Sequence, residues 1–157
     1  MFRDVARKGR ALPKEECIEI LKSTKRGVLS VIGDDGYPYG MPLNHYYNEE
    51  DGKIYFHCGK TGHRKDSLEK CRKVSFCVYD EGRKTDGWAL EFRSVVVFGT
   101  VSFIDDSEKA LDICRRLSLK FTDDISYIEN EINAFADKVC VFSITPEHVT
   151  GKKLREA

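Results

Sequence analysis

The feature that most constrains the fold is the segment of residues 88–104, an unusually long run of β-branched and aromatic residues that predicts a strand. Gly99 lies inside this run, and a glycine within a strand marks a bulge or a bend. A long strand that bends at Gly99 can wrap around a barrel. Because closure removes exposed strand edges, the run favours a small β-barrel over a flat sheet, with a β-sandwich as the alternative.

Five further segments have strand character, which gives six strands in all, mostly antiparallel. They are residues 27–32, 37–47, 53–57, 73–79 and 138–144. Pro38 and Pro42 cannot donate ladder hydrogen bonds, so the second of these strands is expected at an edge of the sheet, or to carry an opening where the backbone is free to meet another group. The predicted fold class is mainly β, an antiparallel barrel with peripheral α-helices.

Four helices are expected around the strands, at residues 13–24, 64–71, 106–121 and 125–135. Pro13 opens the first helix, and Asp105 or Asp106 caps the third. A chain of 157 residues is most simply one domain, residues 1–157. Residues 1–11 are predicted to form an N-terminal arm, and residues 145–157 a C-terminal tail.

Charge and hydropathy exclude several classes of partner. The 26 basic and 26 acidic side chains cancel, so no global field draws the protein to nucleic acid or to an anionic membrane. No apolar run approaches the roughly 20 residues of a membrane span. The six cysteines are spread singly and suit small buried hydrophobes in a reducing compartment, so a cytoplasmic location is predicted.

The pattern of residues 54–68 predicts a strand, a turn that contains Gly59 and Gly62, and then a short helix. Free N–H groups of a first helical turn carry the positive end of the helix dipole. His63, Arg64 and Lys65 follow Gly62 at this joint, so the segment predicts a binding site for a phosphate group. The alternative is a solvated basic surface beside a turn.

A metal site is not predicted. His57, Cys58, His63 and Cys71 include ligand types for zinc, but their spacing matches no standard zinc motif. His57 and Cys58 are also expected to face opposite sides of one strand.

Six motifs in this order resemble those of one known family. They are residues 33–39 with 41–43, residues 52–57, residues 62–65, residues 73–78, residues 92–99, and residues 144–146 with 149–152. The chain resembles the FMN-binding split β-barrels related to pyridoxamine 5′-phosphate oxidase, of the nitroimidazole-resistance type, over residues 2–153. Where the family commonly reads Gly-His-Lys, this chain has an additional Arg64, so the cation that holds the phosphate stays open.

The resemblance implies FMN bound non-covalently at the interface of a homodimer. Its phosphate would meet the turn and the long strand at Gly62, His63, Arg64, Lys65 and Ser94. Its ring system would lie against Tyr39, Met41, Pro42, Leu43 and Asn44, with His57, Cys58 and Gly59 beside it. By the family's pattern, Thr150, Gly151 and Lys152 in the tail would reach the flavin of the partner subunit.

Several of these residues have a plainer structural interpretation. His57 can be a strand residue with satisfied ring nitrogens, and Ser94 a buried hydroxyl bonded to the backbone. Arg93 is expected to pair with Glu91, two residues away on the same face.

The leading functional hypothesis is a flavoprotein oxidoreductase, including nitro-group reduction, that passes electrons from a reduced donor to a small-molecule acceptor. His63 is the predicted catalytic residue, as a proton donor, because histidine titrates near neutral pH. One alternative is a flavin or haem carrier or sensor without turnover. Another is an enzyme acting on a B6 vitamer, which the apparent lack of a second basic cluster for a substrate phosphate disfavours.

Overall fold

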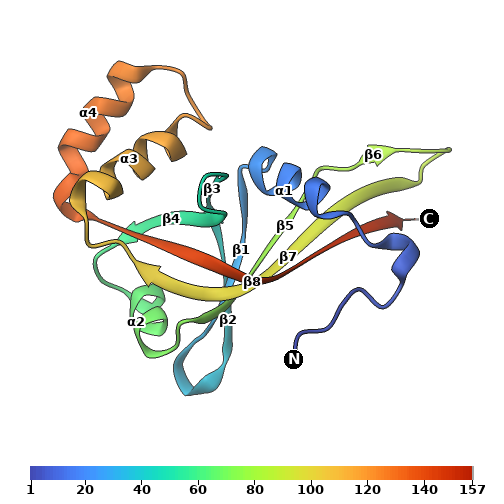
Figure 1. Cartoon of the computed structure of the whole chain (residues 1–157). Coiled ribbons are helices and arrows are strands. Elements are labelled where there is room, and N and C mark those ends of the chain that lie inside the picture. Colours follow the sequence, from blue (N-terminus) through green and yellow to red (C-terminus); the bar gives the residue numbers. More distant parts are fainter. Residues whose placement is uncertain (157) are drawn as a thin grey trace.

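The structure, a computed structural model, describes residues 1–156 and consists of one curled antiparallel sheet with four α-helices around it (Figure 1). The strands are β1 (Arg26–Ile32), β2 (Pro38–Asn44), β3 (Tyr46–Asn48), β4 (Lys53–Gly59), β5 (Lys73–Tyr79), β6 (Arg83–Lys84), β7 (Leu90–Phe103) and β8 (Val139–Glu156). The helices are α1 (Lys14–Ser23), α2 (His63–Lys70), α3 (Ser107–Ser118) and α4 (Ile125–Phe135). This architecture confirms the predicted mainly β class with peripheral helices.

The sheet follows the order β2-β1-β5-β7-β8-β4-β3, and the two-residue β6 pairs with β7 beside this path. Seven strands therefore lie in the main path, where the sequence predicted six. The predicted strand 37–47 is two strands, since His45 separates β2 from β3, and β6 lies in a segment expected to be a loop. β2 is at one end of the path, which confirms the edge position inferred from its two prolines.

The last strand corrects the prediction that regular structure ends near Thr145. β8 continues through Pro146 to Glu156 and pairs with β7 along nearly its whole length. A register shift lies between Phe98 and Gly99, where Gly99 is opposite Pro146. A bulge tolerates a proline because the ladder hydrogen bond is already interrupted there. The irregularity predicted at Gly99 is thus confirmed, but the extra residue is Glu147 of β8, beside Pro146, and not a residue of the long strand.

The apolar core lies between the sheet and α1. Its completely buried members include Ile20, Leu29, Phe56, Phe76 and Phe142. The rings of Phe56 and Phe142 stack with centroids 5.0 Å apart. A smaller cluster of Tyr55, Ile113 and Val141 packs α3 against β4 and β8. The two clusters hold strands and helices in fixed positions around the site described below.

Helices α3 and α4 form a hairpin that stands out from one end of the sheet (Figure 1). Asp106 and Asp124 cap them, and Arg115 pairs with Glu129 through two hydrogen bonds of 2.6 and 3.1 Å. Lys120, after α3, donates to the backbone carbonyls of Thr24 and His45 at 2.7 and 2.8 Å. These contacts hold the hairpin against the sheet.

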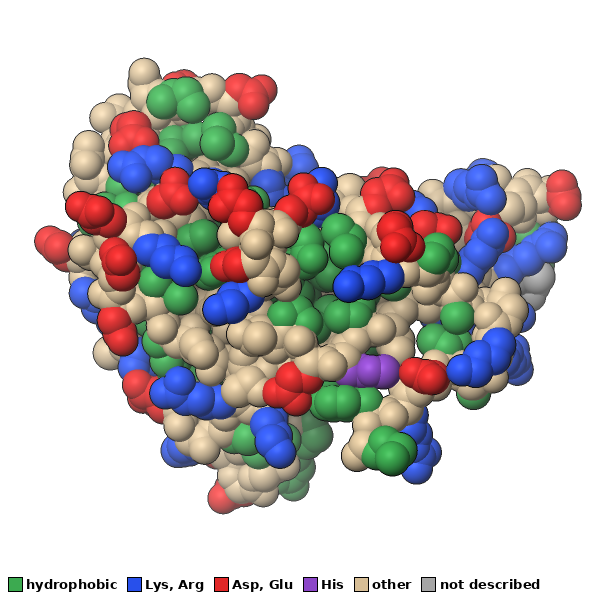
Figure 2. Space-filling model, viewed as in Figure 1, with side chains coloured by type: hydrophobic (Ala, Val, Ile, Leu, Met, Phe, Trp, Pro, Cys, Tyr) green, Lys and Arg blue, Asp and Glu red, His purple; other side chains and the backbone are tan. Residues whose placement is uncertain are grey.

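The face of the molecule seen in Figure 2 carries charged side chains of both signs. Basic and acidic side chains are interspersed over this face, without a large patch of one sign. Apolar side chains gather over α4, where Ile125 and Tyr127 are more than half exposed. Within residues 1–156, no helix has the length and apolarity needed to cross a membrane.

Candidate flavin site

A cavity of about 770 Å³ lies between the sheet and the α3–α4 hairpin. Seven of the residues predicted to bind the cofactor line this cavity, and they come from three different elements of the chain. These are Pro42, Leu43 and Asn44 of β2, His57, Cys58 and Gly59 of β4, and Arg64 of α2. A volume of this size is typical of pockets for cofactors and drug-sized ligands.

The first turn of α2 lies beside this cavity, with Arg64 on the cavity wall. Gly62 is the N-cap, at a φ of 119° that favours glycine, and it offers no side-chain cap. The first α2 backbone N–H with an acceptor inside the helix belongs to Asp66, which donates to the Gly62 carbonyl at 3.1 Å. The N–H groups of residues 63–65 therefore carry the positive end of the helix dipole and can receive an anion.

Arg64 is the cation of this turn that lines the cavity. Its Nε is buried and has no hydrogen-bond partner in the part of the chain that the structure describes. A buried guanidinium N–H without a partner is costly, and a bound anion would satisfy it. Arg64 and the helix N-terminus together therefore fit a phosphate group.

Lys65 and His63 are engaged elsewhere within the chain. The Lys65 ammonium pairs with Glu69, and it lies 5.4 Å from the centre of the Phe103 ring. His63 does not line the cavity; its ring stacks on Tyr39, and its Nε2 is 3.5 Å from an Asp34 carboxylate oxygen. Of the three basic residues at the turn, only Arg64 lines the cavity.

His57 is the one imidazole on the cavity wall among residues 1–156. Desolvation by the surrounding protein, followed by the positive charge of Arg64, lowers its pKa. The ring is consequently neutral at neutral pH in this state, with one nitrogen available as a donor and the other as an acceptor. A bound anion near Arg64 would act in the opposite direction and raise this pKa.

The remaining predicted site residues lie outside the cavity of this chain. Ser94 pairs with Tyr79 and Lys152 in the sheet, and Thr150 pairs with Val96. Gly151 lies against the N-terminal segment: its carbonyl accepts from the Leu12 N–H at 3.0 Å. Met41 faces the core, where it is 8% exposed. Gly62 and Tyr39 border the turn next to the cavity through their contacts with α2.

The opposite wall of the cavity was not predicted from the sequence. Leu111, Cys114 and Ser118 of α3 and Glu131, Ile132 and Phe135 of α4 line it, together with Arg26 and Lys138. The apolar faces of both helices were visible as periodic patterns. What they cover depends on how the hairpin docks, which no local pattern encodes.

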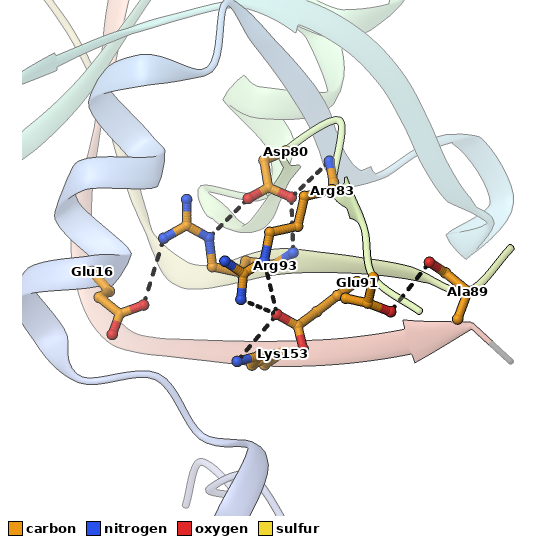
Figure 3. A network of polar contacts seen from close by, with 9 residues as sticks. Glu16, Asp80, Arg83, Ala89, Glu91, Arg93 and Lys153 are labelled. Atoms are coloured by element: carbon orange, nitrogen blue, oxygen red, sulfur yellow. Dashed lines mark hydrogen bonds and ion pairs between the residues drawn. The ribbon is translucent and has the colours of Figure 1, made fainter. Parts of the chain in front are cut away.

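A second cavity, about 530 Å³, lies between the N-terminal segment and β7, and several of the charged side chains that line it pair with one another (Figure 3). Arg93 donates to Asp80 at 2.8 Å and is 3.5 Å from Glu16. The predicted pairing of Arg93 with Glu91 is therefore wrong. Glu91 instead pairs with Arg83 at 2.9 Å and Lys153 at 3.1 Å.

This network also corrects the expectation that the chain has no second basic cluster. Arg83, Arg93 and Lys153 come together in space although they are far apart in sequence. Each has a carboxylate partner, so the cluster offers less to an added phosphate than Arg64 does. Among residues 1–156, no three His, Cys, Asp or Glu side chains are grouped as metal ligands would be.

The curled antiparallel sheet with a cavity at the β4–α2 turn defines the class of the protein, a split β-barrel. A family model described as pyridoxamine 5′-phosphate oxidase matches residues 13–153, so the chain belongs to this family. The match confirms the resemblance drawn from the sequence motifs. A search of curated proteins finds no match.

Solved structures share the fold at low sequence identity. A candidate 5-nitroimidazole antibiotic resistance protein from Bacteroides thetaiotaomicron has a TM-score of 0.79 and 22% identity, over 92% of this chain and 88% of that one. A conserved hypothetical protein from Mycobacterium tuberculosis has a TM-score of 0.80 and 16% identity, over 96% and 90%. A FAD-binding protein from Mesorhizobium loti has a TM-score of 0.68 and 22% identity, over 92% and 97%.

Proposed function

We propose that the protein is a flavoprotein that binds FMN in the 770 Å³ cavity, with the phosphate held by Arg64 and the first turn of α2. The observation that carries the proposal is the buried Nε of Arg64, which lacks a partner among residues 1–156 and belongs to a residue lining the cavity. FAD-binding proteins of the same fold, from Mesorhizobium loti and Mycobacterium smegmatis, support a flavin as the ligand. One helix N-terminus with one buried guanidinium N–H that lacks a partner suits the one phosphate of FMN better than the two of FAD.

The ring system would lie along Pro42, Leu43 and Asn44 of the edge strand β2. Pro42 has no N–H, so part of the backbone on this strand is free of ladder bonds and can face a ligand. Leu111, Ile132 and Phe135 provide an apolar wall on the other side and would exclude water.

We also propose the homodimer expected from the sequence. Ser94 and Thr150 to Lys152 lie in β7 and β8, outside the cavity of their own chain. A second copy would bring its β8 segment to the flavin, so that each site is composite. The reducing cytoplasm is the compartment we propose, in keeping with six cysteines that are all free.

The proposed activity is an oxidoreductase, with nitro-group reduction as one reaction. When bound, a flavin accepts electrons from a reduced donor and passes them to an acceptor. The chain's own residues would orient the ring, hold the phosphate and supply a proton. His63 is the proton donor predicted from the sequence, and His57 is the imidazole that lines the cavity.

The visible absorption spectrum of the purified protein, followed by identification of what a denaturant releases, tests the proposal. We expect yellow protein that releases about one FMN per chain. Yellow protein that fails to reduce nitro compounds with NADH or NADPH would favour the carrier or sensor alternative. Colourless protein that takes up pyridoxamine phosphate but not FMN would favour the B6 alternative.

A further inference from the structure

Cys58 and Cys140 are directly opposite each other on the neighbouring antiparallel strands β4 and β8. Directly opposed residues of an antiparallel pair have Cα atoms about 4.5 or 5.5 Å apart, depending on the type of pair. Both distances are within the range of about 4.4–6.8 Å that a disulfide spans. The backbone therefore already has the separation that a bond between these two cysteines requires.

The two side chains lie on the same face of the sheet. Cys58 is 5% exposed within the core cluster, and the half-buried Cys140 packs against the same cluster. Cys58 also lines the 770 Å³ cavity, next to Gly59, where β4 ends. A reagent can reach Cys140 because it is only half-buried, and Cys140 can then reach Cys58.

The surroundings of the pair are positively charged. Burial and the neighbouring Cys140 raise the pKa of the Cys58 thiol to about 11, while Arg64 and Lys65 of α2 act to lower it. The thiolate is the reactive form of cysteine, and the two cations oppose the effect of burial on Cys58 without overcoming it. No other two cysteines are paired across strands in the part of the chain that the structure describes: Cys77, for example, is opposite Val28 and Val96.

We propose that Cys58 and Cys140 form a reversible redox pair, which small-molecule disulfides such as glutathione disulfide oxidise to a bond that ties β4 to β8 at the cavity wall. The Cys140 thiolate attacks one sulfur of glutathione disulfide and releases one glutathione thiolate. Cys58, after losing its proton to solvent, attacks the Cys140 sulfur of this mixed disulfide and releases the second glutathione. Two protein thiols are oxidised, and one glutathione disulfide is reduced to two glutathione molecules.

The bond would need a small local movement. Opposed Cβ atoms in a ladder are about 4.5–5.5 Å apart, and a disulfide holds them at about 3.8 Å. β4 ends at Gly59 and β8 begins at Val139, so the pair lies at the end of the ladder, where strands adjust most easily. The redox state of the compartment would thereby act on one wall of the cavity.

The test treats the folded full chain with glutathione disulfide and counts free thiols after denaturation. We expect the wild type to lose two thiols without retaining glutathione, and a digest with trypsin to join peptides 54–60 and 139–152. Dithiothreitol should restore both thiols. The control variant is Cys77→Ser, which removes a half-buried thiol of β5 that is not part of the pair. It should also lose two thiols on oxidation.

Cys58→Ser and Cys140→Ser should both abolish the joined peptide. Cys58 is in the core, and the Cys58→Ser variant can fail to fold. In that case the half-buried Cys140→Ser variant alone still tests the proposal. A folded wild type in which peptides 54–60 and 139–152 stay separate would overturn the proposal, as would a Cys140→Ser variant that still loses two thiols without bound glutathione. Neither readout depends on a bound flavin, so the outcome is separate from that of the proposed function.

Discussion

The imidazole of His63 stacks on the phenol ring of Tyr39, with ring centroids 4.3 Å apart and ring planes inclined by 10°. The stack joins the first residue of α2 to the edge strand β2, and Asp34 adds a contact of 3.5 Å to the His63 Nε2. Arg64 follows His63 by one position, about 100° around the helix, and faces the cavity instead. The two neighbours thus have different surroundings.

His63 can be tested as the proton donor without losing this stack. In His63→Phe the aromatic contact with Tyr39 is kept and the titrating ring is removed, so flavin content should stay that of the wild type. Under the predicted role, turnover with NADPH and a nitroimidazole falls by about 10²- to 10⁴-fold. Unchanged turnover, together with a loss in His57→Asn, would assign the role to His57.

Arg64→Gln should weaken FMN binding by about 10- to 100-fold, because a charge-assisted hydrogen bond contributes about 1.5–3 kcal/mol and each 1.4 kcal/mol is a factor of ten in affinity. Titration of apoprotein with FMN, followed by fluorescence quenching, measures the change. Lys65→Gln is the matched control on the next residue, and it should bind FMN nearly as the wild type does. If Lys65→Gln weakens binding more than Arg64→Gln does, Lys65 and not Arg64 holds the phosphate.

Local patterns predicted the parts of the fold that depend on neighbouring residues. The irregularity at Gly99, the edge position of β2 and the turn from β4 into α2 each follow from one or two glycines or prolines in a strand pattern. The family motifs added the position of the cavity, because seven predicted residues line it.

Contacts between distant segments could not be predicted in this way. Pro146 normally ends a strand, and β8 continues past it where the ladder is interrupted, with Glu147 of β8 as the extra residue opposite Phe98 and Gly99. Arg93 pairs with Asp80 and not with Glu91 because the turn before β6 folds back over β7. This brings Asp80 close enough to accept hydrogen bonds from both the side chain and the backbone N–H of Arg93. The α3–α4 wall depends on tertiary docking, to which Lys120 contributes.

The buried His45 predicts a stability that falls in acid. Burial, followed by the charge of Lys120, lowers its pKa from 6.5 to about 3, and its Nε2 lies 2.7 Å from the Leu21 carbonyl oxygen. Below pH 6.5 the unfolded chain takes up a proton that the folded chain does not. The contribution of His45 is therefore fully present above pH 6.5 and is lost as the pH falls toward 3, by up to about 1.4 kcal/mol per pH unit.

Urea denaturation at several pH values between 3.5 and 7, roughly the window over which His45 titrates, measures this dependence. His45→Gln keeps an N–H donor near the Leu21 carbonyl and does not titrate, so its free energy of unfolding should vary less with pH than that of the wild type. Carboxylates and His57 titrate in both proteins, and the difference between the two curves isolates His45. Parallel curves would show that His45 is already protonated in the folded state.

Gly99→Ala tests whether the bulge allows β8 to continue past Pro146. A Cβ at Gly99 would lie 2.4 Å from the Thr145 carbonyl oxygen and 2.7 Å from the Ile144 Cγ2, and the backbone atom cannot yield without moving the strand. We expect the free energy of unfolding to fall by about 1–3 kcal/mol, the usual cost of overpacking. Urea denaturation measures it.

Gly40→Ala is the matched control, since a Cβ there would meet Val28 Cγ1 at 3.5 Å, an ordinary contact, on the edge strand β2. Its free energy of unfolding should stay within about 0.5 kcal/mol of the wild type. If both variants lose the same free energy of unfolding, the close contact between residue 99 and the Thr145 carbonyl is not the reason for a glycine at this position. A loss in Gly99→Ala alone would tie the course of β8, and with it the position of Cys140 beside the cavity, to one residue on β7.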